Sequence, residues 1–281
     1  MLLVVESRED EASVNICARL REETSWAETG FDFERSPILR AGKFLLATIP
    51  DLHIFRERID ELVRAALAGS GLDFTHIIFA SKHKSAAGVR ALTAHPIGNY
   101  GEAEAGGQRQ QLAPAPVALL APALREMRRR ATESRYAGDV TFETTHHGPY
   151  VETPALFIEV GSSDAHWSDA EAGRIVARTI LTLDDSPLPG PVAVGVGGGH
   201  YAPRQVDVAL KRRIAFGHLV PNYALDASGA AAVALAIDRT PRCSALYVDR
   251  KSISGRMNRE VQTLAAERGI KVVRSEDLEP L

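Results

Sequence analysis

The sequence predicts an α/β protein whose mostly parallel or mixed sheet carries helices on both faces. Short apolar runs alternate with longer amphipathic segments along the 281 residues, which is the pattern of strands joined by crossover helices. The content of 45% hydrophobic and 25% charged residues is ordinary for a globular chain. A disordered chain would have fewer apolar residues and a larger net charge than −3.

The expected strands are short, mostly apolar runs. In chain order they are Leu2–Glu6, Phe44–Ile49, His76–Ala80, Val140–Glu143, Leu156–Val160, Val192–Val196, Ala215–Val220, Leu246–Val248 and Lys271–Val273.

The expected helices have apolar residues three or four positions apart, which is the spacing of one buried face. The clearest of them carries Phe55, Ile59 and Leu62 on that spacing. The last one ends at Gly269, a residue type that is common just after a helix. In chain order the helices are Arg8–Glu22, Leu52–Ala68, Pro116–Glu133, Ala165–Leu183, Tyr201–Arg213, Ala227–Ala236 and Ser254–Arg268.

The domain organisation follows from length and from the loops. At about 150 residues per domain the length allows one or two domains. Neither the stretch at about 98–116 nor the Pro-rich Asp184–Pro191 has the character of an interdomain linker. We therefore expect a single α/β domain over residues 1–281, with a flexible loop at about 98–116 that is long enough to act as a lid or substrate loop.

Composition excludes several classes of protein. The near-neutral charge gives no basic field over the whole chain of the kind that marks many nucleic-acid binders. Cys17 and Cys243 are far apart and form no zinc-ribbon spacing. No stretch approaches the roughly 20 apolar residues of a membrane helix, and the apolar start is too short for a signal peptide. We expect a cytoplasmic protein without a membrane partner.

The most informative pattern is positional. Five polar clusters each follow an apolar run directly: Ser81–Gly88, Glu143–Pro149, Gly161–Trp167, Gly197–Arg204 and Gly217–Tyr223. In an open α/β sheet, ligands bind beyond the carboxyl ends of the strands. If these strands are parallel, the clusters meet in one crevice at one edge of the sheet, and bring together six of the nine histidines: His83, His95, His146, His147, His200 and His218.

Two adjacent histidines suggest a metal site. His146 and His147 can both ligate a metal if the backbone turns, which the following Gly-Pro step allows. With Glu159 or His200 they would supply the three protein ligands of a catalytic zinc site. The alternative is that one histidine is structural and the other a general base. The HExxH helix that would strengthen the metal interpretation is absent from the sequence.

Two other clusters favour anion binding. Gly197, Gly198 and Gly199 lie between a strand and a helix, where backbone amides can approach an anion. A tight turn is the alternative, but His200 and Arg204 directly after the glycines favour a functional loop. Lys82 and Lys84 flank His83, either as a phosphate contact with an acid–base group or as a solvated loop. The arginine runs at 125–130 and 211–213 are either solvated faces or contacts to an RNA backbone. GxSxG and P-loop motifs are absent from the sequence.

Taken together, SKHKSAAG, LTAHPIGN, THHGP, FIEVGSS, GVGGGHYAPR and AFGHLVPNYALD resemble the D-aminoacyl-tRNA deacylases of the archaeal and plant type. The resemblance runs from the first strand through Asp226. It implies hydrolysis of the ester that links a D-amino acid to the 3′ end of tRNA, dependence on zinc, and a fold similar to peptidyl-tRNA hydrolases and nucleoside phosphorylases. Its individual ligands and base are not carried over, so the roles below are our own assignments.

We interpret the motif residues as one hydrolytic site. Zinc would activate water, and the acceptor end of the D-aminoacyl-tRNA would be gripped by a small cationic crevice of a monomeric enzyme. In a site without metal, His83 or His200 would be the base. We assign catalytic roles to His83, Glu143, His200 and His218, metal ligation to His146, His147 and Glu159, and substrate contacts to Lys82, Lys84, His95, Gly197, Gly198, Gly199, Tyr201 and Arg204.

Three rival functions remain open at the level of sequence. A zinc-dependent amidohydrolase or peptidase would act on small substrates, and a non-catalytic RNA-binding protein would use the histidines as structural turn residues. A nucleoside phosphorylase would consume phosphate during turnover.

Overall fold

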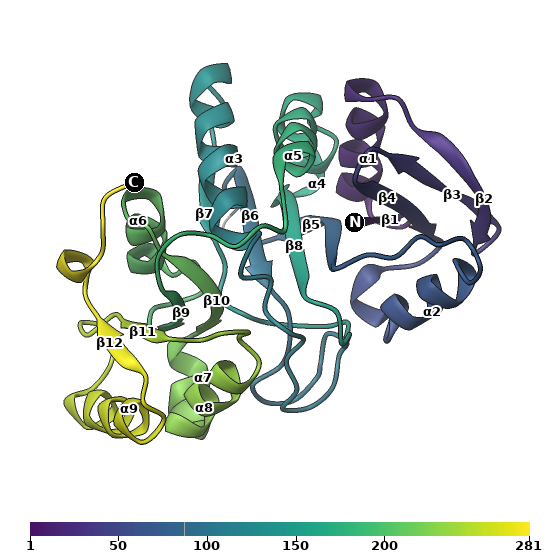
Figure 1. Ribbon diagram of the computed structural model, residues 1–281. Helices are drawn as coiled ribbons and strands as arrows, with labels where there is room; N and C mark the ends of the chain where they lie inside the picture. The colour runs from purple at the N-terminus through teal and green to yellow at the C-terminus, as the bar shows by residue number, and fades with distance from the viewer. Residues whose placement is uncertain (87) are drawn as a thin grey trace.

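The computed structural model describes residues 1–86 and 88–281. Within these residues the strands form two sheets, one of eight strands and one of four. Helices lie on both sides of each sheet, as Figure 1 shows. The α/β class with a mixed sheet and helices on both faces is therefore confirmed.

The large sheet combines a parallel centre with antiparallel flanks. Its strands are β1 (Leu2–Ser7), β2 (Ala27–Phe33), β3 (Ser36–Ala41), β4 (Phe44–Ile49), β5 (His76–Lys84), β6 (Ala91–Pro96), β7 (Asp139–Phe142) and β8 (Ala155–Ser162). They are ordered β2-β3-β4-β1-β5-β8-β6-β7. The strands β4, β1, β5 and β8 run parallel, whereas β6 is antiparallel to β8 and β7 follows β6.

The small sheet is parallel throughout its described pairs. Its strands are β9 (Val192–Val196), β10 (Ala215–Val220), β11 (Ala245–Val248) and β12 (Lys271–Val273), in the order β10-β9-β11-β12. All four match expected strands. The sequence did not predict that they would separate from the first eight into a sheet of their own.

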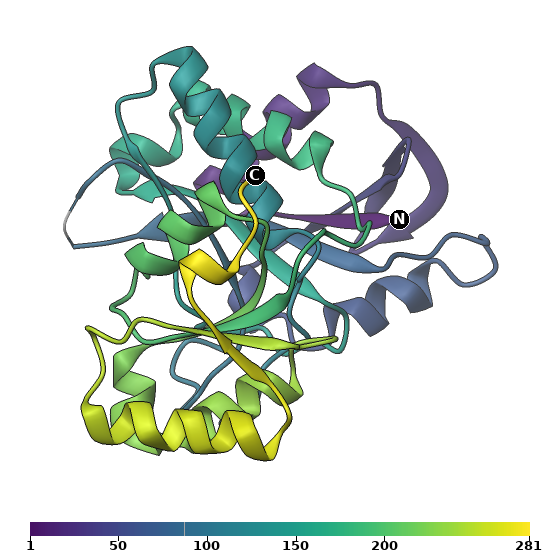
Figure 2. The same cartoon turned by 60° about the vertical axis from the view of Figure 1, so that its left-hand side comes forward.

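The helices divide between the faces of the two sheets (Figures 1 and 2). One face of the large sheet is covered by α1 (Glu11–Glu23), α3 (Leu120–Ser134) and α5 (Ala170–Thr182), and the other by α2 (Ile59–Ala66). The small sheet lies between α6 (Pro203–Lys211) on one side and α7 (Asn222–Ser228), α8 (Ala230–Asp238) and α9 (Gly255–Glu267) on the other. The shortest helix, α4 (Asp164–Trp167), follows β8.

Polar caps and apolar packing explain why these helices start and dock where they do. Asp10 accepts a hydrogen bond from the Ser13 amide at 3.0 Å and so caps α1. The largest apolar core is continuous across both sheets, because Leu124 of α3 and Val208 of α6 belong to the same cluster as Val4 and Phe216. This shared core fixes the position of the small sheet against the large one. No helix in the described part of the chain is long and apolar enough to cross a membrane.

Three departures from prediction have physical reasons. The expected helix at Leu52–Ala68 is a 3-10 turn at His53–Phe55 followed by α2. Arg58 adopts a left-handed φ of 56° between them and donates its amide to the Tyr150 carbonyl, so a tertiary contact overrides the helical spacing. The strands β2 and β3 escaped prediction because β2 is half exposed and carries charged residues. The sequence of β6 gave no apolar run, since it includes His95 and Pro96.

Candidate active site

The candidate catalytic residues gather on one face of the large sheet. On β5, β8 and β6, Ser81 lies opposite Glu159 and Thr93, and His83 lies opposite Gly161 and Ala91. Alternate residues of a strand share a face, so these side chains lie on the same side of the sheet. The expected meeting point at a common carboxyl edge is wrong, because β6 and β7 run against β8.

A cavity of about 440 Å³ opens on this face. It is lined by Asp10, Leu52, His53, Ile54, Ser81, Lys82, His83, Lys84, Ala105, Glu143, His146, His147, Glu159 and His200. The segment after β7 joins the two sheets here, since the Thr144 amide donates to the His200 carbonyl at 2.7 Å and the Thr145 amide to Leu219 at 3.0 Å. The cavity therefore collects side chains from both sheets.

Glu143 is the electrostatic centre of this cavity. Its Oε1 lies 2.8 Å from His83 Nδ1, and its Oε2 lies 2.8 Å from His200 Nε2 and 3.5 Å from His146 Nε2. Although burial opposes ionisation, His200 and His83 hold the pKa of Glu143 well below its usual range. In return, Glu143 raises the pKa of His200, and it raises that of His83 against the effect of burial. The arrangement is an ionised carboxylate between two imidazoles that favour their charged form.

Three other histidines are held in a different protonation state. The Nδ1 atoms of His95, His146 and His147 lie 3.1, 2.8 and 2.7 Å from the backbone carbonyls of Pro96, Thr144 and Gly148. A carbonyl only accepts hydrogen bonds, so each Nδ1 carries the proton and each Nε2 keeps a free lone pair. Burial, together with the neighbouring imidazoles, lowers the pKa of His95 to about 4 and that of His147 to about 3. These rings are neutral at physiological pH.

The neutral trio is suited to a metal ion. Ligand atoms from His95, His146 and His147 all lie within 4.8 Å of one another. The buried His95 Nε2 has no hydrogen-bond partner among the described residues. Histidines that donate Nδ1–H to a carbonyl and present Nε2 are typical zinc ligands. The backbone at His147 has a left-handed φ of 42°. This turn allows the adjacent residues His146 and His147 to point their rings toward the same place.

Glu159, which we expected to be a ligand, belongs to a neighbouring group with His83 and Glu143. Its Oε2 accepts a hydrogen bond from Thr93 at 2.9 Å. Burial and the nearby Glu143 carboxylate raise the pKa of Glu159 well above its usual range. Its Oε1 lies 3.7 Å from Nε2 of His95, which the sequence suggested as a substrate contact and which lies beside His146 and His147 in the structure.

The glycine loop after β9 is built differently from the expected anion cradle. The Gly197 amide donates to Val220 O at 2.9 Å, and the Gly198 amide donates to Asn222 Oδ1 at 3.0 Å and Ser252 Oγ at 2.8 Å. These two amides are therefore used within the protein. Both glycines have φ near +90° (88° and 100°), so they provide the turn that brings His200 into the cavity. Gly199 lies in open space at the same turn.

The remaining predicted substrate contacts lie around the cavity. The Tyr201 hydroxyl is 3.1 Å from His83 Nε2. Lys82 and Lys84 line the cavity, with the Lys82 ammonium 5.1 Å from the Trp167 ring. Arg204 is exposed in the first turn of α6.

His218, which the sequence placed among the catalytic residues, stands apart from the cavity. Its Nε2 lies 2.9 Å from the Ala113 carbonyl and its Nδ1 lies 3.1 Å from Thr145 Oγ1. Both nitrogens are thus in hydrogen bonds, and burial lowers its pKa to about 3. It ties β10 to the segment after β7 and to the loop before α3, which is a structural position.

Sequence reasoning missed two polar residues that line the cavity. Asp10 accepts hydrogen bonds from Ser81 Oγ at 2.9 Å and from the Lys82 amide at 3.0 Å, besides capping α1. Its position near the start of the expected helix Arg8–Glu22 was the available signal, because Asp is a common N-cap residue. The second is His53, whose Nε2 lies 3.1 Å from the Val5 carbonyl and which also lines the cavity.

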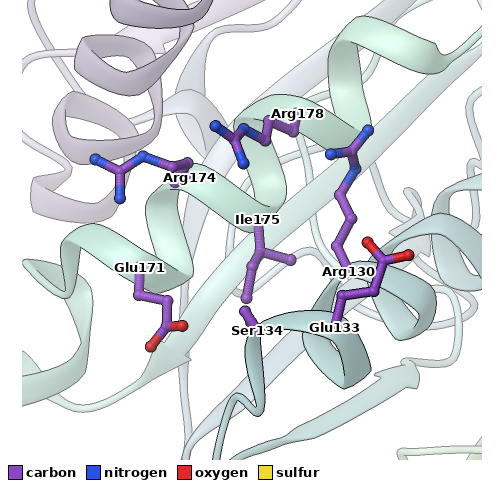
Figure 3. Close-up of a pocket in the computed structure, with 7 residues that line it drawn as sticks. All are labelled: Arg130, Glu133, Ser134, Glu171, Arg174, Ile175 and Arg178. Atoms are coloured by element: carbon purple, nitrogen blue, oxygen red, sulfur yellow. The ribbon is translucent and has the colours of Figure 1, made fainter.

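A second hollow lies between α3 and α5 and is lined by several arginines, as Figure 3 shows. Arg130 pairs with Glu126 at 2.7 Å, and Arg178 pairs with Glu23 at 2.9 Å. Arg125, which lies on α3 like Arg130, donates a hydrogen bond to the Ala209 carbonyl at 2.7 Å. The arginines at 125–130 therefore contact partners within the chain, which argues against an RNA contact there.

Comparison with known proteins places this site in a family. The family described as D-aminoacyl-tRNA deacylase matches residues 70–273. The chain is 36% identical to the D-aminoacyl-tRNA deacylase of Methanosarcina mazei, over 99% of this chain and 93% of that protein. It is 35% identical to that of Pyrococcus horikoshii, over 98% and 100%.

Two further comparisons extend the match. The D-aminoacyl-tRNA deacylase of Methanococcoides burtonii is 38% identical over 99% of this chain, which spans 57% of that longer relative. The crystal structure of a conserved protein of unknown function matches with a TM-score of 0.89 at 31% identity, over 99% of this chain and 96% of that one. On the family match and these relatives, the chain belongs to the D-aminoacyl-tRNA deacylase family.

Proposed function

We propose that the protein hydrolyses the ester bond of D-aminoacyl-tRNA and releases the free D-amino acid and tRNA. The observation that carries the proposal is one cavity that holds a Glu143 carboxylate paired with two imidazoles, together with His146 and His147, whose ligand atoms lie within 4.8 Å of that of the buried His95. The similarity to the D-aminoacyl-tRNA deacylases of Methanosarcina mazei and Pyrococcus horikoshii supports the same activity. The alternative of a binding protein without catalysis does not account for this concentration of buried titratable groups.

We further propose that the metal is zinc and that His95, His146 and His147 hold it. A bound zinc ion supplies Lewis acidity to an ester carbonyl or to water. The backbone carbonyls of Pro96, Thr144 and Gly148 fix the rings so that each Nε2 is available as a ligand.

The acid–base work falls to His200 and His83. Hydrolysis needs a proton taken from water and a proton given to the departing ribose oxygen. Glu143 fixes His200 through Nε2 and His83 through Nδ1. This leaves Nδ1 of the half-exposed His200 to exchange protons with the substrate side, while His83 Nε2 faces Tyr201.

The tRNA acceptor end is proposed to enter over a small cationic rim. Lys82 and Lys84 line the cavity, and Arg204 is exposed in the first turn of α6 near His200 and Tyr201. A few local cations suffice for one single-stranded end, so the net charge of −3 is compatible with this substrate. We propose that the enzyme acts as a monomer in the cytoplasm.

Chirality provides the direct test of function. We expect kcat/KM for D-Tyr-tRNA to exceed that for L-Tyr-tRNA by about a hundredfold or more, because an inverted α-carbon displaces the carbonyl from the catalytic groups. Release of labelled tyrosine from the two matched tRNAs measures the ratio. Equal rates on the two enantiomers would remove the proofreading function. Cleavage of small D-amino acid amides in preference to the tRNA ester would favour the amidohydrolase alternative.

Gly161 is expected to be essential for the position of His83. A Cβ at Gly161 would lie 2.6 Å from His83 Cβ and 2.7 Å from the His83 carbonyl. The variant Gly161→Ala should therefore push His83 from Glu143 and lower kcat by about tenfold or more. Steady-state kinetics on D-Tyr-tRNA measures the loss. As a control, Gly101→Ala adds a methyl group where nothing lies within 4 Å, so an equal loss in both variants would contradict the assignment.

A further inference from the structure

Another cavity, also of about 440 Å³, lies near the catalytic one, since its lining residue Tyr201 is 3.1 Å from His83. It lies between β6, β7 and α6, and we call it the β7–α6 groove. Its apolar surface is formed by Val89, Ala91, Val140, Tyr201, Val206 and Leu210.

Tyr201 connects the groove to the catalytic groups. Its ring lines the groove, while its hydroxyl lies 3.1 Å from His83 Nε2 and its ring centroid lies 5.2 Å from that of His200. A substrate that extends from the catalytic cavity past Tyr201 enters the groove directly. The groove is thus a continuation of the proposed active site.

The spacing of the strands gives the distance that such a substrate must bridge. His83, Gly161 and Ala91 lie opposite one another on three neighbouring strands. Because neighbouring strands are about 4.8 Å apart, Ala91 is about 10 Å from His83 along the sheet. In a 3′-aminoacyl adenosine, five covalent bonds separate the ester carbonyl carbon from the base, a span of about 6 Å, and the purine extends beyond it. The base therefore reaches the groove when the ester lies beside His83.

We propose that the β7–α6 groove binds the adenine base of the 3′-terminal adenosine of tRNA, an inference that rests on the proposed function. The flat faces of a purine match an apolar floor beside an aromatic wall. At the rim, the Asp139 carboxylate and the Thr141 hydroxyl line the same groove and can accept hydrogen bonds from the exocyclic amine.

The amino acid has a separate place. The catalytic cavity has its own apolar wall, formed by Leu52, Ile54 and Ala105. All tRNAs end in the same adenosine, whereas the amino acid varies. A groove with defined apolar walls and a polar rim fits the constant part of the substrate, and the wall of the catalytic cavity is left for the variable side chain.

The test combines a change in the substrate with a change in the groove. D-Tyr-tRNA with the normal terminal adenosine is compared with D-Tyr-tRNA whose terminal nucleotide lacks its base. The groove variant is Val89→Glu and its matched control is Val14→Glu on α1, because both valines are exposed (53% and 42%) and acquire the same charge. AMP binding, measured by calorimetry on all three proteins, provides a readout that is independent of hydrolysis.

We expect removal of the base to raise KM by about ten- to a hundredfold in the unmodified enzyme and in Val14→Glu. Val89→Glu should show the raised KM with the normal substrate and little further change without the base. AMP should bind the unmodified protein and Val14→Glu, and should bind Val89→Glu at least about tenfold more weakly.

Other outcomes overturn the inference while leaving the function intact. Equal KM values with and without the base would show that no pocket recognises adenine. Independent, multiplicative effects of base removal and Val89→Glu would place the base elsewhere. A change in preference between D-tyrosine and D-alanine in Val89→Glu would assign the groove to the amino acid. If no D-aminoacyl-tRNA is hydrolysed at all, the proposed function fails, and the AMP titrations alone decide whether the groove binds adenine.

Discussion

Replacing Glu143 with glutamine is expected to lower kcat/KM for D-Tyr-tRNA by about a thousandfold, comparable to the loss of a carboxylate that orients a catalytic imidazole. The substitution keeps the shape of the side chain but removes the negative charge of the carboxylate. Its two oxygens each lie 2.8 Å from an imidazole nitrogen, one of His83 and one of His200. An amide nitrogen would also face one imidazole nitrogen with a donor where an acceptor is needed. Single-turnover hydrolysis of D-Tyr-tRNA measures the loss in the chemical step.

The control for this variant is Glu6→Gln. Glu6 is also a buried carboxylate in ion-pair contact, with Arg21 at 2.6 Å, but it does not line the catalytic cavity. Its kcat/KM should stay within about threefold of the unmodified enzyme. A loss confined to Glu143→Gln, with thermal unfolding near normal, supports the assignment. Activity within tenfold of normal in Glu143→Gln would exclude a central role for this carboxylate.

Replacing His147 with alanine is expected to remove bound zinc and to lower kcat by about a hundredfold or more. The side chain is one of three imidazoles whose ligand atoms lie within 4.8 Å of one another. Its low pKa of about 3 keeps the ring neutral and able to bind metal over the physiological range. Metal content by atomic absorption after desalting, together with kcat, measures the effect.

A second histidine and a chelator keep this test independent of folding defects. His76→Ala removes a histidine at the start of β5 that contacts Thr75 rather than the trio, and it should retain both zinc and activity. Exhaustive chelation of the unmodified protein should reproduce the His147→Ala loss, and added zinc should restore activity only to the chelated protein. Full activity in a chelated protein shown to be free of metal would contradict the zinc site but not the hydrolysis.

The sequence located the motifs well because each lies at the end of an apolar run. Six of the residues that the motifs suggested as catalytic groups or metal ligands line the cavity in the structure: His83, Glu143, His146, His147, Glu159 and His200. Strand direction was not available from the same pattern. The antiparallel β6 moved the meeting point from an edge to a face, and it placed His95 beside His146, with ring centroids 4.2 Å apart.

The role of each histidine could not be predicted because it depends on what its second nitrogen contacts. In the sequence His95 and His218 look alike, since His95 directly precedes Pro96 and His218 directly follows Gly217. The Nε2 of His95 has no hydrogen-bond partner among the described residues, whereas both nitrogens of His218 are in hydrogen bonds. The glycine loop also matched an anion-binding pattern, but Asn222 and Ser252, which are distant in sequence, occupy the Gly198 amide.

The hydrogen bonds that join Thr144 and Thr145 to the small sheet have a consequence for the integrity of the enzyme. Glu143 comes from the large sheet and His200 from the turn after β9, so their 2.8 Å contact spans the boundary between the sheets. Neither sheet alone carries both members of the pair, so the catalytic contact depends on the apolar core that holds the two sheets together.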